Sequence, residues 1–467
     1  MTVRGGVLER RRARAPSAAP RRPPRAVRVT LIVGLAVAMF AVGGLGLWRG
    51  SGPGPAERTR VPVDRSARAA GPAILTGTLP EQIASLQRRL RALPSDWSSW
   101  ATLGLAYVQE ARVTADPRYY PKAQGALARS LALRPRGNFD ADVGEGALAL
   151  ARHDFAGALA WGERGRAVNP YDDNVYGVIG DAQIELGRYR QAFATIQHMV
   201  NLHPELPSYA RASYARELQG DVPGALHAMR LALQAAGTPE DRAFAAYQLG
   251  ELEFSTGRVG RAAAYYRQAV AMAPEYPPPH AGLAKVAWAH GDLASAIRQY
   301  GAVVQRYPLP EYVIALGDLD TVTGRTAAAA RQYALVRAEE RLFRAAGVNV
   351  DLELALFDAD HGRPHAALAE ARAEWGRRHS ILVADALAWA LHRNGRDRAA
   401  LPFSRFARKL AYRSALIAFH AGMIETALGD RAAGARDLRR ALAINPHFSI
   451  LLAPVARATL HRLGAGR

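Results

Sequence analysis

The sequence contains no cysteine. Disulfide frameworks, cysteine-ligated zinc sites, thiol nucleophiles and lipid attachment through cysteine are therefore excluded. Common catalytic motifs are missing too, since there is no glycine-rich phosphate loop with lysine, no His-Glu-x-x-His helix and no Gly-x-Ser-x-Gly turn. We therefore expect a chain that is not an enzyme and that holds no cofactor and no metal ion.

Lysine is scarce, because Lys122, Lys285 and Lys409 are the only lysines among 61 basic residues. The formal net charge of +20 would by itself suggest a polyanionic partner. However, residues 1–71 carry 14 arginines against three acidic residues, so more than half of the excess lies in that stretch. An arginine bias of this kind is typical of a GC-rich genome. We therefore predict no nucleic-acid partner.

One long hydrophobic run is present, the twenty uncharged residues 29–48. As a helix, this run is long enough to cross a hydrocarbon core of about 30 Å. Nine arginines and one glutamate precede it, whereas the twenty residues after it hold five arginines and two acidic residues. The positive-inside rule then predicts a cytoplasmic tail (1–28), a single transmembrane signal anchor (29–48) and an extracytoplasmic remainder at the cell membrane. The Ala-Val-Ala stretch 36–38 leaves a cleaved signal peptide as an alternative, and both alternatives export the rest of the chain.

Residues 49–77 are rich in glycine, proline, serine and arginine and lack helical periodicity, so we expect a flexible linker. The folded part begins in residues 78–97 with a helix, because Thr78 and Glu81 make a capping box. The apolar stripe expected on this helix comprises Ile83, Leu86, Leu90 and Leu93.

A glycine recurs every 33 to 38 residues through most of the remaining chain. Such a period indicates a solenoid of stacked repeat units. Each glycine is followed at once by arginine or aspartate, as expected where a helix ends in a left-handed residue and a polar turn begins. The recurring glycines are Gly187, Gly220, Gly257, Gly291, Gly324, Gly362, Gly395 and Gly429.

Two further positions hold only small residues in ten successive units. With the recurring glycine at position 15 of a 34-residue unit, position 8 is occupied by Gly104, Gly146, Gly180, Ser213, Gly250, Ala284, Gly317, Ala355, Ala388 and Gly422. Position 20 is occupied by Ala123, Ala158, Ala192, Ala225, Ala262, Ala296, Ala329, Ala367, Ala400 and Gly434. Small residues at both positions predict two helices that meet at close range in every unit.

This pattern resembles the tetratricopeptide repeat family over residues 98–446. The resemblance implies an all-α fold, a right-handed solenoid of about ten helix-turn-helix repeats, closed by a C-terminal capping helix within residues 447–467. It is specific for the fold, although unrelated functions share the family. It is clearest in Trp100, Leu103, Gly104, Tyr107, Tyr120, Ala123 and Pro135, and in Gly180, Gly187, Tyr189, Ala192 and Pro204.

Some units depart from the common length. The first unit holds about seven extra residues (113–119), and units five and eight are three to five residues longer than the others, so we expect loops there. The seventh unit lacks a closing proline and continues through residues 337–346, which predicts a long second helix.

In proteins that this chain resembles, positions 2, 5, 9 and 12 of the first helices line a concave groove. Here those positions make the middle of the groove acidic and aromatic and its end in units nine and ten more apolar. The candidate partner-binding residues are Asn174, Asp181, Tyr214, Glu217, Tyr247, Glu251, Lys285, Trp288, Glu311, Asp318, Asp385, Trp389, His392, Phe419 and Met423. We therefore expect a non-catalytic scaffold that binds a protein or peptide with basic and apolar side chains, in which the aromatic rings supply much of the binding energy.

Other functions remain as alternatives. The aromatic groove and the predicted export also suit a protein that binds cell-envelope polysaccharide or assists its export, although an acidic groove repels anionic glycans. An RNA-binding repeat protein fits the basic charge and the period less well, because the domain is predicted to lie outside the membrane. A clamp for a C-terminal carboxylate needs lysine, asparagine and arginine in the groove, and only scattered examples occur. The ligand-rich turn at residues 358–365 is explained by turn geometry without a metal ion.

Overall fold

The computed structural model describes residues 78–464, and α-helices are the regular secondary structure of this range. The predicted tail (1–28), transmembrane helix (29–48) and linker (49–77) lie outside the described residues. No helix between residues 78 and 464 is both long and apolar enough to cross a membrane. The expected all-α class is confirmed for the described part.

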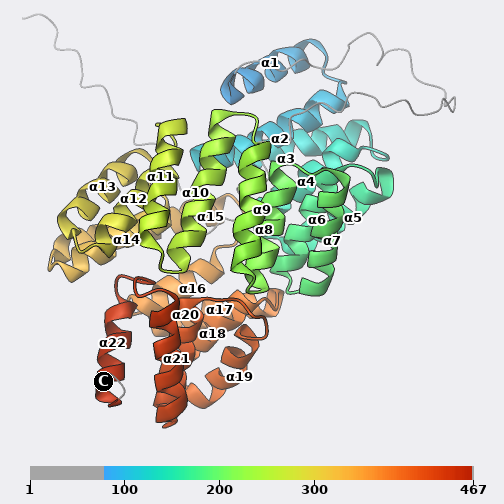
Figure 1. The fold of residues 1–467 in the computed structure, drawn as a ribbon. Coiled ribbons are helices and arrows are strands. Elements are labelled where there is room, and N and C mark those ends of the chain that lie inside the picture. Colours follow the sequence, from blue (N-terminus) through green and yellow to red (C-terminus); the bar gives the residue numbers. More distant parts are fainter. Residues whose placement is uncertain (1–77, 465–467) are drawn as a thin grey trace, which may run out of the picture. The chain divides into compact units, whose positions relative to one another are not determined.

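Twenty-two helices follow one another along residues 78–464 (Figure 1). The first eleven are α1 (Leu79–Ala92), α2 (Trp97–Thr114), α3 (Tyr119–Leu133), α4 (Phe139–Ala151), α5 (Phe155–Val168), α6 (Asp173–Glu185), α7 (Tyr189–Leu202), α8 (Leu206–Leu218), α9 (Val222–Ala235), α10 (Pro239–Ser255) and α11 (Val259–Met272). The others are α12 (Pro277–Ala289), α13 (Leu293–Arg306), α14 (Pro310–Val322), α15 (Thr326–Ala345), α16 (Asp351–Asp360), α17 (Pro364–Arg377), α18 (Ile381–Arg393), α19 (Asp397–Ala407), α20 (Ala415–Ala427), α21 (Arg431–Ile444) and α22 (Leu452–Arg462).

The helices from α2 to α21 form ten pairs of consecutive helices, from α2 with α3 to α20 with α21, and each pair is packed together (Figure 1). These pairs correspond to the ten units expected from the recurring small residues. The helix α1 packs on α2 at one end, with the Thr78–Glu81 capping box in place, and α22 packs on α21 at the other. In the expected stripe of α1, Ile83, Leu86 and Leu90 are buried, but Leu93 follows the helix and is exposed.

Helices of a pair approach closely at the small residues. A Cβ atom on Gly250 of α10 would lie 2.4 Å from the Tyr266 ring of α11, and one on Gly104 of α2 would lie 2.5 Å from Leu127 of α3. The partner position is filled by alanines such as Ala262, which is completely buried. A larger residue at either position would force the helices apart.

The turn inside each unit uses the left-handed conformation that the glycine pattern predicts. All eight recurring glycines have positive φ angles. In units one and two the same turn carries Ala115 (φ 50°) and His153 (φ 60°), which are non-glycine residues in this conformation. A non-glycine residue at positive φ is strained, so tertiary contacts must hold these two turns.

Extra residues lengthen helices more than loops, which corrects one expectation. In unit one, α2 continues to Thr114, and only four residues separate it from α3. In unit five, α10 has 17 residues. The long second helix expected in unit seven is confirmed, because α15 spans 20 residues.

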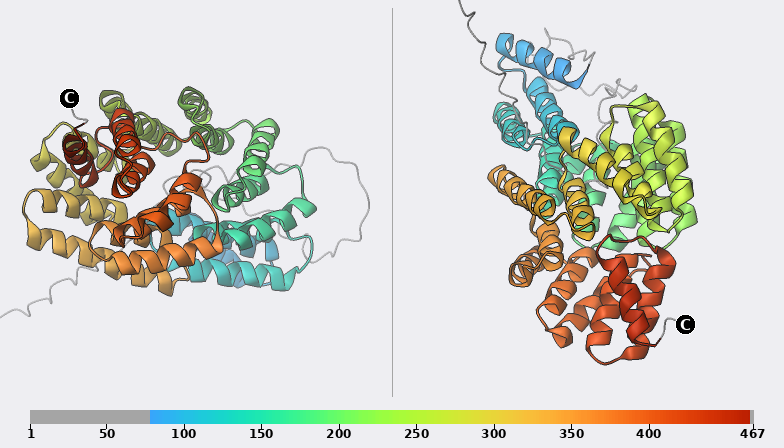
Figure 2. Two further views of the ribbon diagram at one scale, coloured as in Figure 1. Left: turned by 90° about the horizontal axis from the view of Figure 1, so that it is seen from below. Right: turned by 90° about the vertical axis from the view of Figure 1, so that its left-hand side faces the viewer.

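Units far apart in the sequence also contact each other, as Figure 2 shows for the orange helices beside the cyan and green ones. His153 is bonded to Asn349, 196 residues away, at 2.6 Å, and the Tyr189 hydroxyl accepts a hydrogen bond from the Ile381 amide at 2.8 Å. The Asn445 side chain donates to the Phe254 carbonyl at 3.0 Å. Contacts of this kind add to the neighbour contacts on which a repeat stack ordinarily depends.

Candidate functional site

A cavity of about 430 Å³ lies among the first helices of units four to seven. Glu217 comes from α8, Tyr247 and Glu251 from α10, Lys285 from α12 and Glu311 from α14. All five are predicted groove residues, and the structure brings them to one cavity. Its volume lies in the range of roughly 300 to 1,000 Å³ that is common for ligand pockets.

Glu251 is already neutralised within this cavity. The Lys285 ammonium donates to both of its carboxylate oxygens, at 2.8 and 2.7 Å, and the Tyr266 hydroxyl donates to Oε1 at 2.6 Å. Glu251 and Lys285 occupy equivalent positions in neighbouring units, 34 residues apart. The Glu251 carboxylate and the Lys285 ammonium therefore neutralise each other.

Glu217 and Glu311 differ from Glu251, because neither has an ion-pair partner within residues 78–464. Burial, together with the charge of Glu251, raises the pKa of Glu217 to about 7. Burial likewise raises the pKa of Glu311 to about 7, although Lys285 and a hydrogen bond with Tyr312 act in the opposite direction. Both carboxyl groups therefore change charge close to neutral pH.

Two other predicted acids of the groove are engaged by neighbouring side chains. Arg211 of α8 donates two hydrogen bonds to the Asp181 carboxylate of α6, at 2.9 and 2.8 Å. Asp318 of α14 accepts a hydrogen bond from the Tyr333 hydroxyl at 2.9 Å and lies 2.8 Å from the His361 ring. The groove thus has less free negative charge than the sequence suggests.

Four of the five predicted residues of units nine and ten lie in the protein core or in close internal pairs, and the fifth, Met423, is half-buried against the same core. Trp389 and Phe419 are 1% and 0% exposed. The Trp389 indole donates to Asp360 at 2.8 Å and stacks on His420, which in turn bonds to Asp385 at 2.9 Å. His392 lies 2.5 Å from Asp397.

This arrangement corrects the expectation of an apolar binding end in units nine and ten. Phe419 also packs against Phe448, which follows the last unit. The largest side chains at these groove positions, Trp389 and Phe419, are covered by other parts of the chain, so they have no free surface to offer a partner.

The remaining predicted residues, Asn174, Tyr214 and Trp288, are partly exposed. The Asn174 side chain donates to Asp172 at 2.9 Å, within the turn that starts α6. Tyr214 lies beside Glu217 in a small neighbouring cavity. Trp288 makes an edge contact with the His447 ring. None of the three lines the 430 Å³ cavity.

Tyr300 and Tyr312 also line the cavity, although they were not among the predicted groove residues. Tyr300 occupies position 24 of its unit, where the sequence suggests a filler between helices, and it is 4% exposed. Tyr312 directly follows Glu311, so helical periodicity alone points it to another face. In the sequence, the signal for these two cavity residues is the number of tyrosines in the units that also carry the three glutamates.

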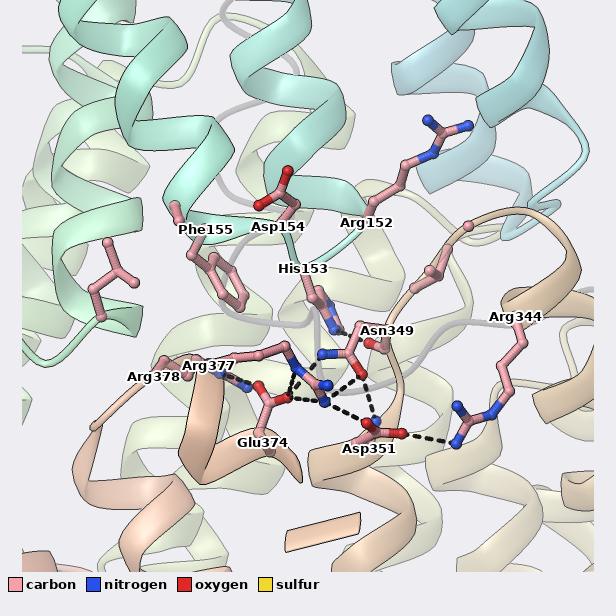
Figure 3. A pocket seen from close by; sticks show the side chains of 14 residues that line it. Arg152, His153, Asp154, Phe155, Arg344, Asn349, Asp351, Glu374, Arg377 and Arg378 are labelled. Carbon is pink, nitrogen blue, oxygen red and sulfur yellow. Dashed lines mark hydrogen bonds and ion pairs between the residues drawn. The ribbon is translucent and has the colours of Figure 1, made fainter. Parts of the chain in front are cut away.

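A second cavity, of about 550 Å³, lies where unit two meets units seven and eight (Figure 3). From unit two, His153 and Phe155 face it, and their rings stack on each other. Opposite them lies a set of residues that we call the arginine network. It comprises Arg344, Asn349, Asp351, Glu374, Arg377 and Arg378.

The charges of the arginine network are paired within it. Arg377 bonds to both Asp351 and Glu374, and Arg344 donates to Asp351 at 2.7 Å. Arg378 bonds to Glu374 and reaches Glu185 at the end of α6. The network therefore fastens unit three to unit eight and leaves little charge for a ligand.

His153 fixes the other side of this cavity. Its ring bonds to the Asn349 carbonyl, while the Asn349 amide donates to the Arg152 carbonyl at 3.0 Å. Burial, with Arg378 acting in the same direction, lowers the pKa of His153 to about 4. The ring is neutral at pH 7 and donates from Nδ1. The histidine that replaces the usual glycine was the sequence signal for this contact.

One group of potential metal ligands occurs within the described residues. Asp173, His203 and Glu205 place one ligand atom each within 4.8 Å of one another. Glu205 also forms the capping box of α8 with Ser208, and the His203 side chain is half exposed. Ion pairing and capping account for this group.

Comparison with known proteins identifies the repeat type. A family profile for the tetratricopeptide repeat matches residues 253–319, from the end of α10 into α14. No curated protein matches the sequence. Among solved structures, a thermophilic TPR protein from Thermus thermophilus is 24% identical, with a TM-score of 0.33, over 36% of this chain and 91% of that one.

Two other similar structures differ more in sequence. A tetratricopeptide repeat protein from Parabacteroides merdae is 14% identical, with a TM-score of 0.33, over 55% of this chain and 97% of that one. The MamA protein is 17% identical, with a TM-score of 0.28, over 36% of this chain and 91% of that one. At TM-scores below 0.5, these likenesses carry no inference about function. The match to the tetratricopeptide repeat family is therefore shown for residues 253–319.

Proposed function

We propose that this protein is a non-catalytic, membrane-tethered scaffold whose groove binds a protein or peptide partner that carries basic and apolar side chains. The observation that carries the proposal is the 430 Å³ cavity. Four consecutive first helices of the stack contribute to it, and they combine tyrosine rings with two carboxylates that lack an ion-pair partner among the described residues. Tyrosine is enriched among the residues that contribute most of the binding energy of protein interfaces.

The tether and the location of the repeats belong to the same proposal. The support is the uncharged run 29–48 and the excess of arginine before it. A scaffold held at the membrane would keep its partner close to the outer surface.

The partner-binding proposal predicts that charge reversal in the cavity abolishes partner capture. We expect the double substitution Glu217→Lys and Glu311→Lys to reduce capture about tenfold or more, because the partner's basic groups would meet like charges. The measurement is crosslinking in cells with the full chain as bait, followed by quantification of the crosslinked proteins.

The control for this prediction is Glu240→Lys, an exposed position on α10. Asp318 is left unchanged, because its contacts with Tyr333 and His361 are internal. Equal capture by the double variant and the control would refute the binding of a basic partner in this groove.

The proposed topology can be tested because the chain has no cysteine of its own. A single cysteine at Tyr171, whose side chain is 83% exposed, should react with a membrane-impermeant maleimide added to cells stripped of their wall. A single cysteine at Ser17, in the predicted cytoplasmic tail, should react only after the membrane is opened. Protection of the cysteine at position 171 would contradict an external repeat domain.

A further inference from the structure

The free charge of the 430 Å³ cavity is negative. Glu217, Glu251 and Glu311 contribute three carboxylates, and Lys285 is the basic residue that lines it. Because Lys285 and Glu251 bind each other, the charge that remains belongs to Glu217 and Glu311. These two side chains come from α8 and α14, three units apart along the stack.

The surroundings of the two carboxyl groups favour the binding of a positive charge. Tyr247, Tyr300 and Tyr312 form apolar walls around Glu311, and their rings are almost fully buried. Rings of this kind attract a cation, and an ion pair is stronger where water is excluded. The other charged and titratable groups near the two carboxyl groups are Tyr214, Tyr276, Tyr307, Tyr412 and the Asp181–Arg211 pair.

We propose that this cavity takes basic side chains, arginine or lysine, of the partner protein, whose cationic head groups contact Glu217 and Glu311. The inference rests on the proposed function and adds to it the chemical group that is recognised. The occupant has to be cationic because these half-buried carboxylates lack an ion-pair partner among the described residues.

Binding of a cation should be coupled to proton release. Since burial raises the pKa of Glu217 and Glu311 to about 7, each group is partly protonated at neutral pH. A cation favours the ionised form, so it lowers both pKa values and expels protons. Affinity should therefore increase as the pH rises from about 6 to about 8, where the carboxylates are ionised before the ligand arrives.

The test is isothermal titration calorimetry of the purified full chain with N-acetylarginine amide. The matched control ligand is N-acetylcitrulline amide, which has nearly the same shape but no charge. We expect binding of the arginine compound alone, with affinity about tenfold higher at pH 8 than at pH 6 and with proton release detected by comparing two buffers of different ionisation enthalpy.

Two variants locate the binding. Glu217→Gln and Glu311→Gln should each lower the affinity about tenfold, whereas the exposed Glu240→Gln on α10 should leave it unchanged. Circular dichroism checks that each variant is folded. Equal binding of citrulline amide, or unchanged affinity in both cavity variants, would overturn the proposal. If partner capture in cells persists in that case, the scaffold function stands and only the cationic pocket fails.

The chain's own arginines are a competing occupant. One outcome is that N-acetylarginine amide binds only after Arg58, Arg60, Arg65 and Arg68 are changed to glutamine in the full chain. In that case an arginine of the chain itself fills the cavity, and the partner proposal is wrong. If the unaltered chain already binds the probe, the cavity is open to a partner.

Discussion

Replacement of Arg378 by alanine is expected to lower the free energy of unfolding by about 3 to 5 kcal/mol. The Arg378 side chain is 4% exposed and lies between Glu374 of its own unit and Glu185 of unit three, with its guanidinium group 4.5 Å from the Phe155 ring centre. Its removal would leave the buried Glu185 without its counter-charge and Glu374 with Arg377 as its remaining counter-charge. Urea denaturation followed by circular dichroism measures the loss.

The control for this substitution is Arg372→Ala, an exposed arginine on α17, the helix that Arg378 directly follows, and it should change stability by less than about 0.5 kcal/mol. Hydrogen exchange should show faster opening around residues 185–189 and 374–381 in the Arg378 variant. Adding Glu185→Gln to the Arg378→Ala variant should restore part of the free energy of unfolding, because it removes a buried carboxylate that has lost its counter-charge. If the Arg378 variant were as stable as the control, the ion pairs would not hold the two units together.

The second large effect is expected at Glu339 of α15. Its side chain is completely buried, and neither carboxyl oxygen has a hydrogen-bond partner within the described residues. Burial raises the pKa of Glu339 to about 9 from its ordinary value of 4.5. The folded chain therefore keeps this proton between pH 4.5 and about 9, where the unfolded chain has released it.

The sign of the pH effect follows from this difference. The Glu339 carboxyl group lowers the free energy of unfolding progressively as the pH rises from 4.5 toward 9, by up to about 1.4 kcal/mol for each pH unit. At pH 7 the accumulated loss is roughly 3 kcal/mol. The substitution Glu339→Met removes the titrating group and keeps a similar volume. It should raise the free energy of unfolding by about 1 to 3 kcal/mol at pH 7, and the gain should grow from pH 6 to pH 8.

Urea denaturation of both proteins at several pH values checks this prediction. The matched control is Glu275→Met, since the Glu275 side chain is 80% exposed. A gain at Glu339 that does not change with pH would contradict the buried, protonated carboxyl group and point to improved packing alone.

The sequence predicted the units of the fold because the same packing constraint recurs ten times. Small residues at two positions and a left-handed turn residue leave little freedom inside one unit, as Gly250 against Tyr266 illustrates. Contacts between distant units have no comparable period. Arg378 and Glu185 are ordinary charged residues in sequence, and only the three-dimensional path of the stack brings them together.

The groove was predicted in part for a related reason. Position in the repeat selected Glu217, Tyr247, Glu251, Lys285 and Glu311, which line one cavity in the structure. The position of a residue in the repeat did not reveal which groove residues neutralise one another across neighbouring units. It also did not reveal which of them are covered by other segments of the chain. The pairs Asp181–Arg211, Glu251–Lys285 and Asp385–His420 are separated by 30, 34 and 35 residues, close to one repeat length, so a search for opposite or hydrogen-bonding side chains at that spacing would have found them.

The contacts between distant units limit how this chain can change in evolution. An ordinary solenoid gains or loses a repeat with little cost, because each unit depends only on its neighbours. Here the pairs His153–Asn349, Tyr189–Ile381 and Phe254–Asn445 are 191 to 196 residues apart. Duplication or deletion of one unit between Phe254 and Asn349, the stretch that all three pairs enclose, would shift all three pairs out of register together. The number of repeats in this stretch is therefore expected to stay constant among descendants of the protein, while repeats added beyond either end would leave these pairs intact.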